Sequence, residues 1–83
     1  MNQVQFSINF EEAFNAAVKR EENFKDGTIN WDFIDADVVS IMLEEDPMME
    51  LSDFDYYREL YEDLFDTFAT NWEQENELVW IKA

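Results

Sequence analysis

Residues 53–74 are DFDYYRELYEDLFDTFATNWEQ, and they carry a long amphipathic pattern. Apolar side chains recur there at intervals of three and four, which is the spacing of one helix face: Phe54, Tyr57, Tyr61, Leu64, Phe65, Phe68 and Trp72. Ser52 followed by Asp55 fits a capping motif at the start. The pattern predicts a helix over residues 53–74 with one apolar face and one acidic face.

A first helix is predicted over residues 10–22. Its apolar positions recur at the same helical spacing: Phe10, Ala13, Phe14, Ala17 and Val18. Asn9 and Glu12 have the spacing of a capping box, which would start the helix there. The dipeptide Asp26-Gly27 follows as the strongest turn signal in the chain.

Residues 28–46 allow two interpretations. In one, Asn30 caps a helix over residues 31–44 that places Trp31, Ile34, Val38, Ile41 and Met42 on one face. Such a helix would end near Asp46, because Pro47 disfavours the helical conformation at the residue before it. In the other, Ile29, Trp31 and Phe33 alternate in a strand and a helix begins only near Asp35. We favour the helix over residues 31–44.

Two short strands are predicted at the termini. Val4, Phe6 and Ile8 alternate with polar residues, which is typical of a half-buried strand over residues 3–9. The apolar run Leu78–Ile81 predicts a closing strand over residues 78–82, which could pair antiparallel with the first. The expected fold is therefore α+β and mostly helical, with three helices in one domain over residues 1–83.

The charge balance excludes several classes of function. The 83 residues include 21 Asp and Glu but only 5 Lys and Arg, so the formal net charge is −16. So few bases cannot form a nucleic-acid-binding surface, and an anionic membrane would repel the chain. No stretch approaches the roughly 20 apolar residues of a membrane span, and the start lacks the layout of a secretion signal. We therefore expect a cytoplasmic protein that binds a basic partner.

Catalysis and metal binding find little support in the sequence. It contains no Cys and no His, which removes thiolate chemistry and the commonest general base. The acids around Asp53 and Asp55 do not form a calcium-binding loop, because Tyr57 occupies the third ligand position and the required Gly is missing. We expect no catalytic residue, no metal site and no cofactor.

The acidic residues are concentrated in one part of the chain. Residues 32–77 hold sixteen of the acids and one base, Arg58, for a net charge of −15. The densest group, here called the acidic stripe, would lie along the helix over residues 53–74: Asp55, Glu59, Glu62, Asp63 and Asp66. Eleven helical steps span about 16.5 Å, or one charge per about 3.3 Å, close to the phosphate spacing of one DNA strand.

Further acids and one aromatic residue complete the candidate partner-binding set. They precede or interrupt the acidic stripe in the sequence: Asp32, Asp35, Asp37, Glu44, Glu45, Asp46 and Tyr56. The like-charged pairs Glu59–Asp63 and Glu62–Asp66 have helical i, i+4 spacing, which destabilises a helix. A helix selected for stability alone would interleave Lys, so this arrangement favours a binding role over simple solubility.

The chain resembles the small acidic inhibitors of phages and mobile elements that imitate the charge of DNA, a class that includes anti-CRISPR and anti-restriction proteins. The resemblance rests on size, on the charge of residues 32–77, on the lack of Cys and His, and on the acidic stripe. It implies an inhibitor acting in the host cytoplasm. Such an inhibitor would occupy the basic channel of a CRISPR effector complex or a defence nuclease and exclude DNA.

Other modes of binding remain open. An acidic adaptor or antitoxin-like module could neutralise a basic protein through an apolar epitope centred on Met48, Met49 and Leu51. An allosteric inhibitor of a defence complex would compete with DNA only in part or not at all. A chain this small could also bury an apolar face in a homodimer.

Overall fold

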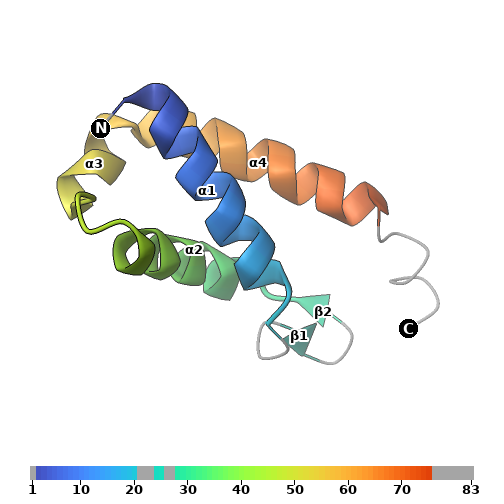
Figure 1. Ribbon diagram of the computed structural model, residues 1–83. Helices are drawn as coiled ribbons and strands as arrows, with labels where there is room; N and C mark the ends of the chain where they lie inside the picture. The colour runs from blue at the N-terminus through green and yellow to red at the C-terminus, as the bar shows by residue number, and fades with distance from the viewer. Residues whose placement is uncertain (1, 21–23, 26–27, 76–83) are drawn as a thin grey trace.

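The computed structural model describes residues 2–20, 24–25 and 28–75. Within these ranges the protein is mostly helical, as predicted (Figure 1). The helices are α1 (Gln3–Val18), α2 (Trp31–Glu45), α3 (Leu51–Tyr56) and α4 (Arg58–Glu75). Two-residue strands, β1 (Phe24–Lys25) and β2 (Thr28–Ile29), pair antiparallel between α1 and α2.

The predicted N-terminal strand over residues 3–9 is wrong, because these residues form the first half of α1. The Asn2 side chain caps this helix by accepting a hydrogen bond from the Gln5 backbone N–H at 2.8 Å. Phe6 is fully buried, whereas Val4 and Ile8 are 69% and 45% exposed. Phe6 therefore extends the apolar face of α1 by one turn toward the N-terminus.

The bounds of the first predicted helix, residues 10–22, were also wrong. Asn9, expected as the cap, lies inside α1 and donates a hydrogen bond to Asp46 at 2.8 Å. The helix ends at Val18, where the backbone N–H groups of Lys19 and Arg20 donate to the carbonyls of Ala16 at 3.3 Å and Ala17 at 3.2 Å.

Helix α2 confirms the helical interpretation of residues 31–44. The Asn30 side chain accepts hydrogen bonds from the backbone N–H groups of Asp32 at 3.1 Å and Phe33 at 3.3 Å. Ile29 belongs to strand β2, so the strand alternative held only for the residues just before the helix. The helix ends at Glu45, with Asp46 as its C-cap.

The predicted single helix over residues 53–74 is divided into α3 and α4 at Tyr57. Tyr57 leaves the helical conformation, with φ −101° and ψ 28°. Its ring and that of Phe54 both pack on Phe6, at centroid distances of 5.0 and 5.9 Å. The chain thus bends around the start of α1. The cap of α3 is Glu50, whose backbone N–H donates to Asp53 at 2.9 Å, and not Ser52 as predicted.

The β-structure found differs from that predicted. Phe24 pairs with Ile29 and Lys25 with Thr28, so the two strands flank the predicted turn at residues 26–27. The expected closing strand over residues 78–82 lies outside the described residues. With the N-terminal strand replaced by helix, the predicted α+β fold with paired terminal strands is withdrawn.

The core lies between α1, α2 and α4. Figure 1 shows α1 starting beside α4 and then diverging from it, with α2 below and α3 at the end opposite the strand pair. Its buried part consists of Ile29, Met49 and ten side chains of α1 and α2: Phe6, Phe10, Ala13, Phe14, Ala17, Val18, Ile34, Val38, Ile41 and Met42. Helix α4 adds only half-buried side chains, largely aromatic, packed edge-on against Phe10 and Phe14. None of the described helices is both long and apolar enough to cross a bilayer.

Candidate functional site

The acidic stripe is exposed but is not one straight line of charge. Glu59, Glu62, Asp63 and Asp66 lie on α4 within an arc of about 100° and along about 10.5 Å of helix. Asp55 lies on α3, beyond the bend at Tyr57. The predicted match to the phosphate spacing of DNA assumed one helix, so it does not extend to Asp55.

The bend and the packing of α4 divide the acidic stripe between two hollows. Asp55, Glu59 and Asp63 line one of about 520 Å³, together with Gln3 of α1 and Tyr56 of α3. Glu62 and Asp66 lie on the part of this arc nearer α2 and line a second hollow of about 330 Å³. One face of α4 therefore supplies acids to two neighbouring hollows.

The second hollow, here called the α2–α4 groove, joins segments about thirty residues apart in the sequence. Asp32 and Asp35 of α2 and Glu62 and Asp66 of α4 supply its four carboxylates. The rings of Trp31, Tyr61 and Phe65 supply its apolar lining. It is an aromatic-lined groove with acids contributed by both helices.

Tyr61 ties the two sides of the groove together. Its hydroxyl donates a hydrogen bond to the Asp35 side-chain carboxylate. Burial raises the pKa of Tyr61, and the hydrogen bond to Asp35 and the negative charge of that residue raise the pKa further. Tyr61 therefore remains a neutral donor at neutral pH and occupies part of the hydrogen-bonding capacity of Asp35.

Trp31 fixes the groove at the start of α2. Its ring stacks on Phe14 at 6.2 Å and meets Phe65 and Trp72 edge-on at 6.0 and 5.8 Å. Its indole Nε1–H donates to the Glu73 carboxylate at 2.8 Å. The ring is therefore held from α1 and α4 while part of it stays accessible.

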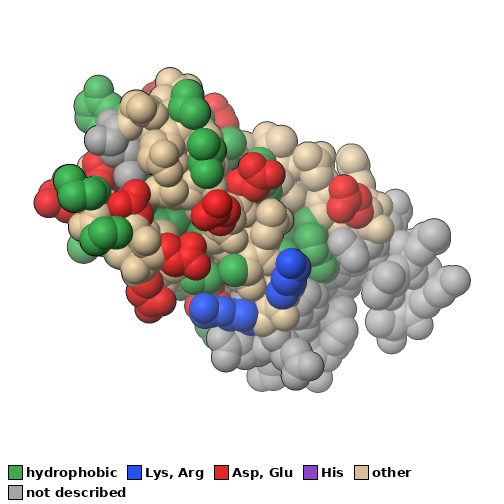
Figure 2. Space-filling view, viewed as in Figure 1, with side chains coloured by type: hydrophobic (Ala, Val, Ile, Leu, Met, Phe, Trp, Pro, Cys, Tyr) green, Lys and Arg blue, Asp and Glu red, His purple; other side chains and the backbone are tan. Residues whose placement is uncertain are grey.

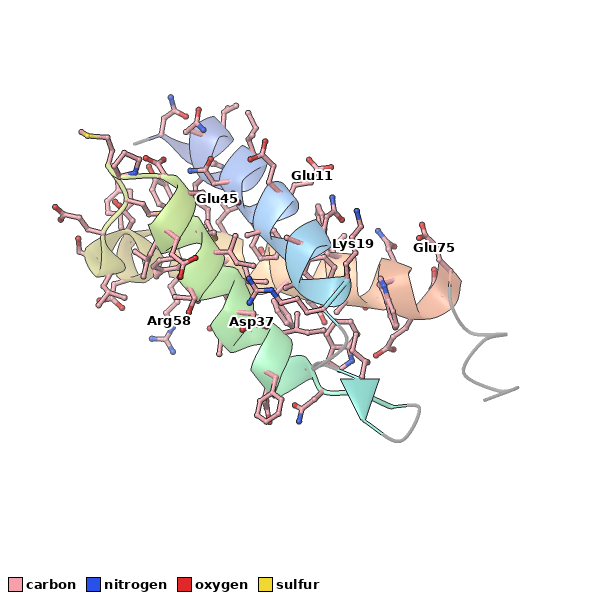
Figure 3. All side chains as sticks on the ribbon, turned by 60° about the horizontal axis from the view of Figure 1, so that its bottom comes forward. Glu11, Lys19, Asp37, Glu45, Arg58 and Glu75 are labelled. Carbon is pink, nitrogen blue, oxygen red and sulfur yellow. The ribbon has the colours of Figure 1, made fainter. Side chains whose placement is uncertain are left out.

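The remaining predicted acids lie apart from the groove. Asp37 is paired with Arg20 at 3.5 Å across α1 and α2, and Figure 3 shows it on the side of α2 toward α1. Asp46 accepts hydrogen bonds from Asn9 and from the Met48 backbone N–H, both of which fix the connector after α2. Glu44 and Glu45 are exposed near the C-terminal end of α2.

Lys and Arg are sparse on this surface. Arg58 pairs with Glu62 at 3.4 Å, but both side chains are mostly exposed and the ion pair is weak. Figure 3 shows Arg58 extending away from the helices. The other described bases with placed side chains, Lys19 and Arg20, follow the end of α1, where Figure 2 shows Lys and Arg atoms gathered.

The described residues contain no group of three or more His, Cys, Asp or Glu that could hold a metal ion. Comparison with protein families, curated proteins and solved structures finds no match for this chain. Any function proposed for it therefore rests on its own surface.

Sequence reasoning missed the aromatic part of this site. Tyr61 and Phe65 were placed on the apolar face of the predicted helix over residues 53–74, and Trp31 on the apolar face of the helix over residues 31–44. The structure leaves all three half-buried along the α2–α4 groove. The one available signal was the adjacency of Trp31 and Asp32, since an aromatic residue beside acids on a helix is a candidate for an interface.

Proposed function

We propose that this protein is an inhibitor that binds the basic nucleic-acid-binding surface of a defence nuclease or CRISPR effector complex and excludes DNA. The proposal is supported by the gathering of exposed acids from α2, α3 and α4 along the groove and the neighbouring hollow. A surface of this charge would attract a Lys/Arg-lined channel from a distance. On contact, its negative potential would complement the positive potential of the channel.

The placement of the described bases is consistent with this role. Lys19 and Arg20 follow the end of α1, and Arg20 pairs with Asp37 of α2 at 3.5 Å. Arg58 is the only base on α4, and its exposed pair with Glu62 leaves Glu59, Asp63 and Asp66 without a described ion pair. Carboxylates would thus stand where phosphates stand in the channel.

The proposal is tested by charge reversal on α4. The variant Glu59→Lys, Glu62→Lys, Asp63→Lys and Asp66→Lys should lose inhibition of its target and no longer displace DNA. The control reverses four exposed acids that lie outside the candidate partner-binding set: Glu11, Glu12, Glu50 and Glu75. Figure 3 shows Glu11 on α1 and Glu75 at the end of α4. This control changes the net charge by the same amount but leaves the acidic stripe intact. It should therefore retain most of the inhibition.

The measurement is target-bound DNA as a function of inhibitor and of salt. Binding should weaken steeply between about 50 mM and 500 mM salt, because the contacts are ionic. An inhibitor that binds its target without reducing DNA occupancy would exclude mimicry as the mechanism. Equal losses of inhibition in the two charge-reversed variants would mean that the partner recognises net charge and not the acidic stripe.

A second candidate is an acidic adaptor that binds through an apolar epitope. Met48, Leu51 and Tyr56 are 81%, 69% and 81% exposed around α3, which favours such an epitope there. Met49, expected to belong to it, is 5% exposed and packs in the core. Alanine at Met48 and Leu51 would then weaken partner binding more than charge reversal on α4 does.

A further inference from the structure

We infer that the α2–α4 groove is the anchor point of the partner interface and seats the side chain of an arginine. This inference rests on the proposed function, since it assumes a basic protein partner, and it names the part of the surface that selects that partner. The groove offers the two features that a guanidinium group recognises together, an aromatic wall and carboxylates on opposite sides.

The groove is open because α4 packs incompletely. No side chain of Arg58–Glu75 is fully buried, although the helix carries a continuous apolar face. Phe65 meets the ring of Trp31 at 79° and lies 29° from the plane of Tyr61, with centroid distances of 6.0 and 6.1 Å. These half-buried rings leave aromatic surface that a further group could cover.

The charges of the groove are only partly satisfied within the chain. Tyr61 donates to Asp35, and Arg58 pairs with Glu62. Asp32 of α2 and Asp66 of α4 have no Lys or Arg partner among the described residues, and both are exposed. An incoming cation would therefore meet two available carboxylates, one from each helix.

Arginine fits this arrangement better than lysine. Its guanidinium is planar, stacks on aromatic rings and directs five N–H donors outward in its own plane. It can therefore stack on one exposed aromatic face of the groove while donating to carboxylates of both helices. The space of about 330 Å³ is at the low end of ligand-sized pockets, which suits one long side chain and not a whole helix.

The test compares two peptides on the intact protein. An arginine-rich peptide and a lysine-rich peptide of equal length and charge are titrated separately, and the Trp31 indole N–H is followed by NMR. We expect the arginine peptide to bind at least about fivefold more tightly, through stacking that lysine lacks, and to shift the Trp31 signal at saturation. Equal affinities, or an unmoved Trp31 signal, would overturn the inference without involving any variant.

A pair of isosteric variants then separates the groove from the general charge. Asp32→Asn with Asp66→Asn removes two groove carboxylates, and Glu59→Gln with Asp63→Asn removes two carboxylates of α4 outside the groove. The groove variant should lose about tenfold or more in arginine-peptide affinity, and the control less than about threefold. Circular dichroism verifies that both retain their helices.

The outcomes distinguish this inference from the proposed function. Equal losses in the two variants would refute the groove as anchor but leave the acidic surface as the binding face. Unchanged affinity in both variants would refute the groove and the acidic surface together. A larger loss in the control would place the anchor in the hollow lined by Asp55, Glu59 and Asp63 instead.

Discussion

Tyr61 on α4 donates a hydrogen bond to the carboxylate of Asp35 on α2. This contact joins two helices that are otherwise held together mainly by aromatic edges, such as Trp31 against Phe65 and Trp72. Because it spans the α2–α4 groove, it sets the separation of the two acidic sides. The same bond thus contributes to the stability of the fold and to the shape of the candidate site.

Replacing Tyr61 with Phe should lower the free energy of unfolding by about 1 kcal/mol at pH 7, because the hydrogen bond to a charged acceptor is lost. The effect should also depend on pH. The folded protein raises the pKa of Tyr61, so the folded state keeps a proton that the unfolded chain releases above about pH 10. The Tyr61 contribution is therefore complete below that pH and declines above it.

The measurement is urea unfolding at about pH 7 and again above about pH 10. The difference between the natural protein and Tyr61→Phe should shrink at the higher pH. Tyr56→Phe is the matched control, because Tyr56 is 81% exposed and should change stability little at either pH. A difference that stays constant with pH would contradict a role for the Tyr61 proton.

The cap of α2 gives a second prediction. Asn30→Ala removes the acceptor of two backbone N–H groups and should cost about 1 kcal/mol of stability. Asn71→Ala on the exposed face of α4 is the control, and it should be neutral or slightly stabilising because Ala is the better helix former. Thermal melts of both variants check this. Equal destabilisation would mean that the cap contributes nothing specific.

The fold was predictable where the pattern of apolar residues was long. Residues 31–44 and the second half of 53–74 show the helical period over several turns, and both are helices. Residues 3–9 are too few to show the helical period. Val4, Phe6 and Ile8 alternate as in a strand, and helical spacing appears only when Phe6 is paired with Phe10. The bend at Tyr57 depends on packing against Phe6, which is distant in the sequence.

The candidate site was predictable only one helix at a time. The exposure of the acidic stripe on α4 follows from its spacing, because those residues lie opposite the apolar face. The pairing of Asp32 and Asp35 with Glu62 and Asp66 in one groove does not follow, since it depends on how α4 lies against α2. The ion pair of Asp37 with Arg20, which separates Asp37 from the other predicted acids, likewise depends on tertiary structure.

The N-terminal half of α1 can be tested directly. A strand would bury Val4, Phe6 and Ile8 on one face, whereas the helix buries only Phe6. Phe6→Ala should cost about 3 kcal/mol or more, a large part of the stability of so small a domain. Val4→Gln and Ile8→Gln should each change stability by less than about 0.5 kcal/mol in chemical denaturation. Similar losses at all three positions would support the strand instead.

Charge repulsion along α4 should lower the stability of the fold. Asp63→Lys replaces the like-charged pair with Glu59 by an opposite pair at i, i+4, and should stabilise the protein by about 0.5–1 kcal/mol at low salt. Asp63→Asn, which only removes the repulsion, should gain about half as much. Both gains should fade near 1 M salt, where surface charges are screened. Gains that persist there would point to helix propensity instead. If Asp63→Lys gains stability while weakening partner binding, the charge of α4 is maintained for binding at the expense of stability.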